Sequence, residues 1–545
     1  FMTEIAALLA AATADLGYEV DFPAAGLPSE GRDRVNVVVA PHEFFTLQEG
    51  VSESDLLRAA SACAVVGVEQ PGTDWFELGT HYASAARAIF DISPHATAEL
   101  LRRDLPATHL QLGYHPTWDR WGGDPTRLRH TDVLFLGSST ARREDLLGEA
   151  APLLWDCHAD LRLFEFLLPM NEPTGHFLAG ADKWDLLAGS RILLNVHRNE
   201  VPYFEWVRVL ESIVNGCLVV TELSSDYGPL VPGEHLVAAP ADALAAYAAS
   251  LALDENLRAE LAGNAYHFVR SKLELTNLLA PFWDDLTHQV GAPRTAGEVH
   301  PYRPAGPGAA QPVAPIVREL DARYAAAGAR IKAVLDSESR LSRSVEALQA
   351  RLAYGDANHS AVTPSAAWAG FRPEVSVVVT CYNYGERVAR ALDSVLACSG
   401  VEAEIVVVDD HSSDSSVDRV KGFIEDHPWF PALLLARSAN GGVSAARNAA
   451  FAAARADRVF VLDADNAVYP HCLAKLSAAL DAHPEAGFSY GILAKEGAPG
   501  LLSQYPWDTR RLVFGPYIDA MSMIRRSVWE ELGGYDEVTS LLGWE

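Results

Sequence analysis

Two carboxylates late in the sequence stand in a spacing that suits a metal ion. Asp463 and Asp465 are two residues apart at the end of the apolar run Arg458–Asp463 (RVFVLD). On a continuing strand such a pair points to one side. Hard oxygen ligands that bind through few groups suit Mg²⁺ or Mn²⁺ bridged to a diphosphate. A lone Asp-x-Asp pair is also common in solvated loops, so this prediction depends on what lies beside the pair.

Three further polar clusters stand where other apolar runs end. They contain Thr380, Tyr382 and Asn383, then Asp409 and Asp410, then two glycines at 441–442 followed by Arg447. The aromatic ring of Tyr382 can stack on a nucleotide base, and a carboxylate can accept a hydrogen bond from a base N–H or a ribose hydroxyl. The glycines let the backbone approach a ligand closely. A capped loop explains any one cluster as well. Because ligands of open α/β sheets bind outside the carboxyl ends of the strands, the four clusters together predict a nucleotide and metal site.

The first half of the sequence carries a second set of polar strand ends. Its members are Gly137, Ser138, Arg143, Asn195, His197, Arg208, Glu211 and, in an earlier segment, His42. Gly137 and Ser138 precede Arg143 as in a phosphate loop at a helix N-terminus. Arg208 and Glu211 are three apart and share a helix face, which a surface ion pair also explains. His42 could act at a reaction centre or be a satisfied structural histidine.

Alternating strands and helices must position these side chains. Between residues 1 and 290 we expect strands at Val35–Ala40, Ala64–Val68, Ala88–Ile92, Asp132–Leu136, Ile192–Val196 and Cys217–Thr221, with helices such as Ala96–Arg103 and Ala241–Leu251. Continuous apolar runs are typical of parallel strands covered on both faces. The pattern predicts a doubly wound α/β fold, in lobes of about 1–120 and 130–290.

A second α/β unit is expected at residues 374–545. Its strands are Val375–Thr380, Glu404–Asp409, Ala432–Ala436 and Arg458–Asp463, and its helices are Arg387–Leu396, Ser415–Glu425 and Ser444–Ala456. This order places the four polar clusters at one edge of a parallel sheet.

Linkers and one long helix separate the two units. Residues 291–314 are a Pro/Gly-rich linker, residues 355–373 form a second linker, and residues 315–354 predict a helix. Steps of four and three from Leu320 reach apolar residues at every position but Glu338. Such a heptad pattern favours a coiled coil that makes a homodimer or holds two domains apart. A helix packed on its own chain explains the pattern as well.

Composition excludes several classes of partner. The 545 residues include 43 basic and 72 acidic side chains, a net charge of −29, so we expect no nucleic-acid partner.

The six cysteines form no Cys-x-x-Cys pair, which favours buried free thiols in a reducing compartment. We find no signal peptide and no apolar run of about 18 residues that predicts a transmembrane helix. The expected location is the cytoplasm, with peripheral membrane contact left open.

The C-terminal motifs resemble family-2 glycosyltransferases of the GT-A fold. The likeness covers about 374–545 and includes VSVVVTCYN, VVVDDHSSD, NGGVSAARN, LDAD, MIRR and GGYDE. The resemblance implies that a UDP-sugar contacts Thr380, Tyr382, Asn383, Asp409 or Asp410, Arg447 and Asp463, and that Asp465 binds Mn²⁺ or Mg²⁺. The family inverts the anomeric centre with a carboxylate near a Trp-Glu-Asp-like motif as general base. This sequence reaches only Gly543-Trp544-Glu545, so Glu545 is the catalytic candidate and we expect a domain truncated at its C-terminus.

The N-terminal features resemble the nucleotide-binding lobe of GT-B glycosyltransferases of the group-1, family-4-like class. Glu211 stands in the place of the second glutamate of a paired-Glu motif, which contacts ribose. Eight residues earlier the sequence has Tyr203 instead of the first glutamate, and Glu205 is only six away. The resemblance implies a metal-free site, in which helix N-termini and arginine offset the diphosphate charge. His42 would stand on the other wall of the cleft.

Together the resemblances imply a bifunctional glycosyltransferase. It would transfer sugars from nucleotide-activated donors to a growing glycan or glycoconjugate. The alternative is one active module beside a module that only binds glycan or a partner. A nucleotide-sugar pyrophosphorylase would need a Gly-rich basic loop after the first strand, which VTCYNYGER does not provide.

Overall fold

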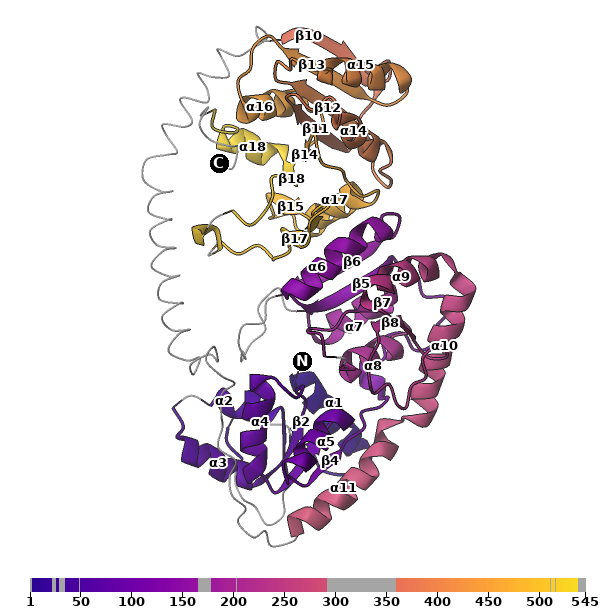
Figure 1. Ribbon diagram of the computed structural model, residues 1–545, viewed down its shortest axis with the longest axis vertical. Coiled ribbons are helices and arrows are strands. Elements are labelled where there is room, and N and C mark those ends of the chain that lie inside the picture. The colour runs from indigo at the N-terminus through magenta and orange to yellow at the C-terminus, as the bar shows by residue number, and fades with distance from the viewer. Residues whose placement is uncertain are drawn as a thin grey trace. The chain divides into compact units, whose positions relative to one another are not determined.

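The computed structural model describes residues 2–21, 26–28, 35–48, 50–164, 178–201, 203–291, 359–509, 511–514 and 516–537. The chain divides into two compact units, unit 1 at residues 1–316 and unit 2 at residues 317–545 (Figure 1). The helix expected at 315–354, nearly all of the linker at 291–314, and Glu545 lie outside the described residues. Part of the second expected linker is instead a strand, β10 at His359–Pro364.

Unit 1 contains two parallel sheets. Their orders are β1-β2-β3-β4 and β6-β5-β7-β8-β9. The strands are β1 Asn36–Val39, β2 Cys63–Gly67, β3 Ala88–Asp91, β4 Ala107–His109, β5 Thr131–Ser138, β6 Ala159–Phe164, β7 Ser190–Asn195, β8 Leu218–Glu222 and β9 Val237–Ala239. The six predicted strands are all present. The three that sequence reasoning missed, β4, β6 and β9, are edge strands, whose apolar runs are short.

Helices cover both sheets of unit 1. They are α1 Met2–Asp15, α2 Pro41–Thr46, α3 Glu53–Ser61, α4 Asp74–Ala85, α5 Pro94–Arg102, α6 Ala141–Ala150, α7 Gly180–Ala188, α8 Trp206–Val214, α9 Leu244–Leu253, α10 Glu255–Lys272 and α11 Leu275–Gly291. Although α11 follows the second sheet in sequence, Phe282 packs on Phe90 of β3, with ring centroids 4.6 Å apart. Asp285 accepts a hydrogen bond from Thr108 of β4 at 2.9 Å. The last helix therefore returns to the first sheet, where α11 lies beside β4 (Figure 1), and does not stay with the segment 130–290 as expected.

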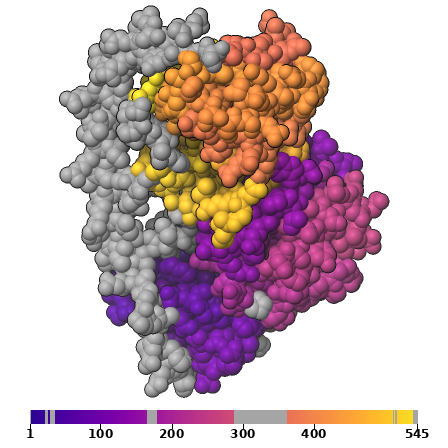
Figure 2. Space-filling model, turned by 45° about the horizontal axis from the view of Figure 1, so that its top comes forward, coloured from indigo at the N-terminus to yellow at the C-terminus, as the bar shows by residue number. Residues whose placement is uncertain are grey.

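Unit 2 is built on one mixed sheet of order β10-β13-β12-β11-β14-β18-β15. Its elements are β11 Val375–Cys381, α14 Val388–Leu396, β12 Ala403–Asp409, α15 Ser416–Asp426, β13 Ala432–Arg437, α16 Val443–Ala453, β14 Arg458–Asp463, α17 Cys472–Ala482, β15 Phe488–Tyr490, β18 Ser522–Arg525 and α18 Arg526–Leu532, with a small hairpin of β16 Leu493–Ala494 and β17 Leu501–Leu502. The strands β11 to β14 are parallel to one another, as predicted. The antiparallel β10 is at the edge of the sheet and appears as the reddest residues of unit 2 at its surface (Figure 2).

Both faces of the central strands in unit 2 are buried. Val377 and Val379 pack in one hydrophobic cluster with residues of α14, α15 and α17. Val378, between them, packs in a second cluster with Phe451 of α16. Alternating side chains therefore enter opposite layers, which explains why the strand reads as an unbroken apolar run.

All six cysteines are free thiols, as expected, and three of them, Cys63, Cys217 and Cys381, are buried. Within the described part of the chain, we find no helix with both the length and the apolar character needed to cross a membrane.

A close backbone contact in unit 1 gives the first test of the fold. A Cβ at Gly113 would come within 1.9 Å of the carbonyl oxygen of Leu273, which accepts a hydrogen bond from the N–H of Tyr114 at 2.7 Å. Gly113→Ala must push these segments apart, and we expect it to lower the free energy of unfolding by about 2 kcal/mol or more. Denaturant unfolding followed by circular dichroism measures the change.

The matched control is Gly263→Ala in α10, where nothing lies within 4 Å of an added Cβ. This change should raise the free energy of unfolding by about 0.5–1 kcal/mol, the difference in helix propensity. Equal changes in the free energy of unfolding for the two variants would contradict the close contact between Gly113 and Leu273.

Candidate functional site

The strand register of unit 2 brings the predicted C-terminal residues together. Thr380 of β11 stands beside Asp463 of β14, and Cys381 of β11 stands beside Asp409 of β12. Arg447 of α16 donates from Nη2 to Oδ1 of Asp463 at 3.2 Å. The clusters therefore meet at the carboxyl edge of one sheet, as the sequence predicted.

The structure separates the roles of two adjacent carboxylates that the sequence left as alternatives. Asp410 is 3% exposed and its carboxylate is 2.6 Å from Nη1 of Arg437 and 2.8 Å from the N–H of Gly442. Asp409 is 1% exposed, and its Oδ1 accepts from the N–H of Ser412 at 2.9 Å. The other oxygen of Asp409, Oδ2, is buried and has no partner among the described residues. Asp410 therefore holds the glycine loop, whereas Asp409 has one carboxylate oxygen that no described residue engages.

The first polar cluster supplies one structural residue and one accessible ring. The N–H of Asn383 donates to Oγ of Ser412, and Oδ1 of Asn383 accepts from the N–H of Ser413, both at 2.9 Å. Asn383 therefore ties the loop after β11 to the loop after β12. Tyr382 beside it is 50% exposed, so its ring is available for stacking.

The carboxylate pair suits a divalent cation in its chemistry. The side chains of Asp463 and Asp465 are each about one-third exposed, and Nη1 of Arg387 is 3.6 Å from Oδ2 of Asp465. Burial raises the pKa of Asp463, and Arg447 opposes that shift. No group of three or more His, Cys, Asp or Glu side chains that could hold a metal occurs among the described residues. Asp463 and Asp465 could supply two oxygen ligands, which fits an ion that takes its other oxygens from a diphosphate and water.

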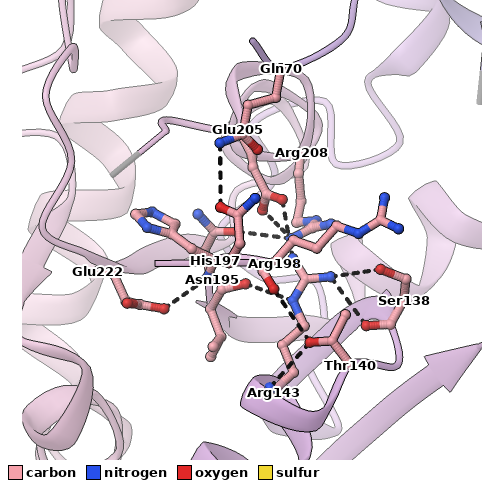
Figure 3. Close-up of polar contacts among 12 residues, drawn as sticks. Gln70, Ser138, Thr140, Arg143, Asn195, His197, Arg198, Glu205, Arg208 and Glu222 are labelled. Carbon is pink, nitrogen blue, oxygen red and sulfur yellow. Dashed lines mark hydrogen bonds and ion pairs between the residues drawn. The ribbon is translucent and has the colours of Figure 1, made fainter. Parts of the chain in front are cut away.

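A second cluster forms in unit 1 where β5 and β7 end (Figure 3). Arg143 donates from Nη1 to Oγ of Ser138 at 3.0 Å, and from Nε to the carbonyl oxygen of Val196 at 2.9 Å. Arg208 donates from Nη1 to Oδ1 of Asn195 at 3.0 Å. Five of the predicted residues therefore converge: Ser138, Arg143, Asn195, His197 and Arg208. We refer to them, with Arg142, Arg198, Glu205 and Glu222, as the arginine cluster.

Arg143 and Gly137 have structural roles inside this cluster. Arg143 is 1% exposed, and burial lowers its pKa to about 10. A Cβ at Gly137 would come within 3.0 Å of Nη1 of Arg143. Gly137 is therefore small because the arginine passes over it, whereas the sequence suggested a backbone approach to phosphate.

Glu205 is the carboxylate that joins the cluster. Its Oε1 lies 3.1 Å from Nη2 of Arg143, and its Oε2 pairs with Arg208. Burial alone would raise the pKa of Glu205, but the two arginines hold it below its ordinary value. Glu205 therefore locks Arg143 and Arg208 in place at the start of α8.

Glu211, predicted to share a binding face with Arg208, is engaged elsewhere. Its side chain is 4% exposed and lies 2.7 Å from Nζ of Lys183, which also pairs with Glu4 of α1 at 2.6 Å. Trp184 donates to the same Glu211 oxygen at 3.3 Å. The carboxylate therefore stabilises the packing of α1, α7 and α8, and the structure does not bring it to the arginine cluster.

The cluster keeps cationic groups at its surface. Arg142 makes a bidentate pair with Glu222, and its side chain is 25% exposed, close to the 23% of Arg208. Arg198 is exposed. Thr140 caps the N-terminus of α6, where its Oγ1 accepts from the N–H of Arg143 at 3.3 Å. Arginines beside a helix N-terminus can bind an anion such as a diphosphate.

His197 and His42 are both buried. The backbone N–H of His197 donates to Oε1 of Glu222 at 2.7 Å, and its Nε2 lies 3.0 Å from Oγ of Ser224. His42 is 4% exposed, with Nε2 3.3 Å from Oε1 of Glu69 in the loop after β2. A buried ring paired with a carboxylate is what a satisfied structural histidine shows, which was the alternative for His42.

Sequence reasoning missed Asp91, a fully buried carboxyl at the end of β3. It is 1% exposed, accepts from the N–H of Ser93 at 2.8 Å, and burial raises its pKa to about 8. Its position directly after an apolar run was the available signal.

The raised pKa of Asp91 predicts a pH dependence of stability. Between about pH 4 and pH 8 the folded chain holds a proton that the unfolded chain, with an ordinary pKa of 3.8, has lost. The free energy of unfolding should therefore fall as pH rises through this range, by about 1.4 kcal/mol per pH unit from this group. Asp91→Asn should flatten that slope in denaturant unfolding, while Asp156→Asn at an exposed position should not. An unchanged slope in Asp91→Asn would refute the assignment.

Comparison with known proteins gives two family matches. Residues 376–533 match the family described as Glycosyl transferase family 2, and residues 134–280 match the one described as Glycosyl transferase-like. The succinoglycan biosynthesis protein ExoO of Rhizobium meliloti is 38% identical over 110 residues, 20% of this chain and 30% of ExoO. The uncharacterized glycosyltransferase alr2836 of Nostoc sp. is 40% identical over 103 residues, 19% of this chain and 31% of that protein.

This chain therefore spans about a third of the length of these curated relatives. Among solved structures, TarS 1-349 of S. aureus matches 30% of this chain and 50% of its own, at 22% identity and a TM-score of 0.26, which is too low to inform the fold. The match at 376–533 includes Asp409, Arg447 and the Asp463–Asp465 pair, and the match at 134–280 includes the arginine cluster. The chain thus carries a glycosyltransferase family 2 domain at residues 376–533 and a glycosyltransferase-like region at residues 134–280.

Proposed function

We propose that the chain transfers sugars from two nucleoside-diphosphate-activated donors, one bound in each unit. The observation that carries the proposal for unit 2 is the buried Oδ2 of Asp409, which lacks a partner among the described residues at the edge where Arg447 and the Asp463–Asp465 pair also lie. A base N–H satisfies such an oxygen. The accessible ring of Tyr382 can stack on the base.

In unit 2 the protein's own groups bind and orient the donor. Asp409 fixes the base, Arg447 directs its guanidinium toward the phosphates, and Asp463 and Asp465 would hold Mn²⁺ or Mg²⁺. Such an ion, when bound, offsets the charge of the departing nucleoside diphosphate. We propose this GT-A arrangement for a UDP-sugar, with Glu545 as the catalytic carboxylate.

In unit 1 we propose a GT-B arrangement that needs no metal. Arg142, Arg198 and Arg208 would offset the diphosphate charge together with the N-terminus of α6, and Glu205 and Glu222 hold the arginines in position. Preorganised cations in a partly buried site stabilise charge that develops on a leaving group. Glu211 is left out of this site because it pairs with Lys183.

The proposal extends to the acceptor, the assembly and the location. ExoO is a succinoglycan biosynthesis protein, which supports a growing glycan as acceptor. The heptad pattern of 315–354 supports a homodimer. The composition supports a cytoplasmic location, with peripheral membrane contact left open.

Single variants distinguish two hypotheses. Either both units are active transferases, or one unit is active and the other only binds. We expect Asp465→Ala to abolish the Mn²⁺-dependent part of donor hydrolysis across a nucleotide-sugar panel. Arg208→Ala should remove the part that persists in EDTA. If all hydrolysis is lost in EDTA, or Arg208→Ala leaves it unchanged, unit 1 is not a second transferase.

The pair Asp409 and Asp410 gives a test within unit 2. Asp409→Asn replaces the free acceptor oxygen and should weaken nucleotide binding about tenfold with little loss of stability. Asp410→Asn leaves Arg437 buried without its charge partner and should lower the free energy of unfolding by about 3 kcal/mol. Calorimetric titration and denaturant unfolding measure the two effects. The reverse outcome, with Asp410→Asn the binding-defective but stable variant, would contradict the assignment.

A further inference from the structure

The two carboxylates of the candidate metal site in unit 2 each pair with an arginine, and the two arginines differ in exposure. Nη2 of Arg447 lies 3.2 Å from Oδ1 of Asp463, and the side chain of Arg447 is 4% exposed. Nη1 of Arg387 lies 3.6 Å from Oδ2 of Asp465, and the side chain of Arg387 is 67% exposed. One arginine is therefore enclosed by the protein, whereas the other is largely open to solvent.

The surroundings of Arg447 keep it in place. Its guanidinium carbon lies 5.6 Å from the centroid of the Tyr535 ring, and the adjacent Ala446 packs in the hydrophobic cluster that contains Val378. Moving such a side chain away from its carboxylate would leave a buried charge without its partner, which is costly. Arg447 is therefore a fixed partner of Asp463.

Arg387 has a fixed backbone and a free side chain. Its N–H donates to the carbonyl oxygen of Tyr384 at 2.9 Å, directly before the first turn of α14. The N–H of Gly385 donates to Oδ2 of Asp414, also at 2.9 Å, which anchors the same loop. Exposed side chains change rotamer readily. The guanidinium of Arg387 can therefore leave Asp465 while the loop stays in position.

A guanidinium at Asp465 competes with a divalent ion for the same carboxylate. Both are cations, so an ion on Asp465 and the guanidinium of Arg387 repel each other unless the arginine moves. A diphosphate that shares the ion offers the displaced guanidinium a new partner. Arginine binds phosphate oxygens through the same planar set of N–H donors with which it binds a carboxylate.

We propose that Arg387 pairs with Asp465 while no donor is bound and transfers its guanidinium to a phosphate oxygen when the nucleoside diphosphate binds with its ion. Arg447 keeps Asp463 in both states. Arg387 therefore weakens metal binding to the free chain and makes tight metal binding depend on the nucleotide. The inference rests on the proposed function of unit 2, and it adds to that function a residue that couples the two ligands.

Electron paramagnetic resonance of Mn²⁺ on the full chain tests the proposal, because the signal of the free aqueous ion is lost when the ion binds. The ion is titrated without nucleotide and with saturating UDP or GDP, and a protein-free blank corrects for Mn²⁺ held by the nucleotide. Without nucleotide, Arg387→Gln should bind Mn²⁺ about threefold more tightly than the wild type, as expected for the loss of one exposed competing ion pair. With nucleotide the two should bind Mn²⁺ equally, because the wild-type guanidinium has already left Asp465.

Two further variants separate this role from a general effect of charge. Arg390 is three residues further along, its side chain is 56% exposed, and it pairs with Glu496. Arg390→Gln removes the same charge from a side chain that is engaged elsewhere, and it should leave both dissociation constants unchanged. Arg387→Lys keeps a cation beside Asp465 and should restore the weaker Mn²⁺ binding of the wild type.

Three results would overturn the proposal: equal Mn²⁺ affinity of the wild type and Arg387→Gln without nucleotide, a gain that persists undiminished with nucleotide, or an equal gain in Arg390→Gln. Asp465→Ala distinguishes this failure from failure of the proposed function. If Asp465→Ala weakens Mn²⁺ binding while Arg387→Gln matches the wild type, only the role of Arg387 is wrong. If Asp465→Ala binds Mn²⁺ as the wild type does, the metal site of the proposed function is wrong as well.

Discussion

Parallel strands that are buried on both faces can carry polar side chains only where they end. In unit 2 the strands β11, β12 and β14 run in register between two hydrophobic clusters, so Thr380, Asp409 and Asp463 reach the same edge. In unit 1 the ends of β5 and β7 bring Ser138 and Asn195 into the arginine cluster in the same way. The ends of the buried strands therefore determine where polar side chains gather, and the residues of the following loops determine which chemical groups are present there.

The second requirement is charge balance in a chain with a net charge of −29. A buried guanidinium is tolerated only with a carboxylate partner, and both units supply such partners. Asp410 holds Arg437 under the glycine loop, and Glu205 holds Arg143 under the loop after β5. These two ion pairs hold the loops of the sites in position, and we assign them no contact with a ligand. The groups left at the surface differ between the units: paired carboxylates in unit 2, and arginines in unit 1.

The sequence predicted the sheets well because each central strand is a continuous apolar run, and those signals do not depend on distant residues. It also placed the C-terminal clusters at one edge, because strands that alternate with helices are parallel and their carboxyl ends meet at the same edge of the sheet. It did not separate Asp409 from Asp410, because the difference is made by Arg437 and Gly442, some thirty residues away. Glu211 was chosen on its spacing, but Lys183 of another helix engages it, and Glu205 joins the cluster instead. The state of Asp91 depends on burial, which the sequence around it does not show.

The central claim is that one chain binds two nucleoside diphosphates by two different means of offsetting their charge. Calorimetric titration of the full chain with UDP, GDP and ADP tests it most directly. With Mn²⁺ present, the account predicts two binding equivalents per chain summed over these nucleotides, and with EDTA it predicts one. A single equivalent in Mn²⁺, or the loss of all binding in EDTA, would contradict it.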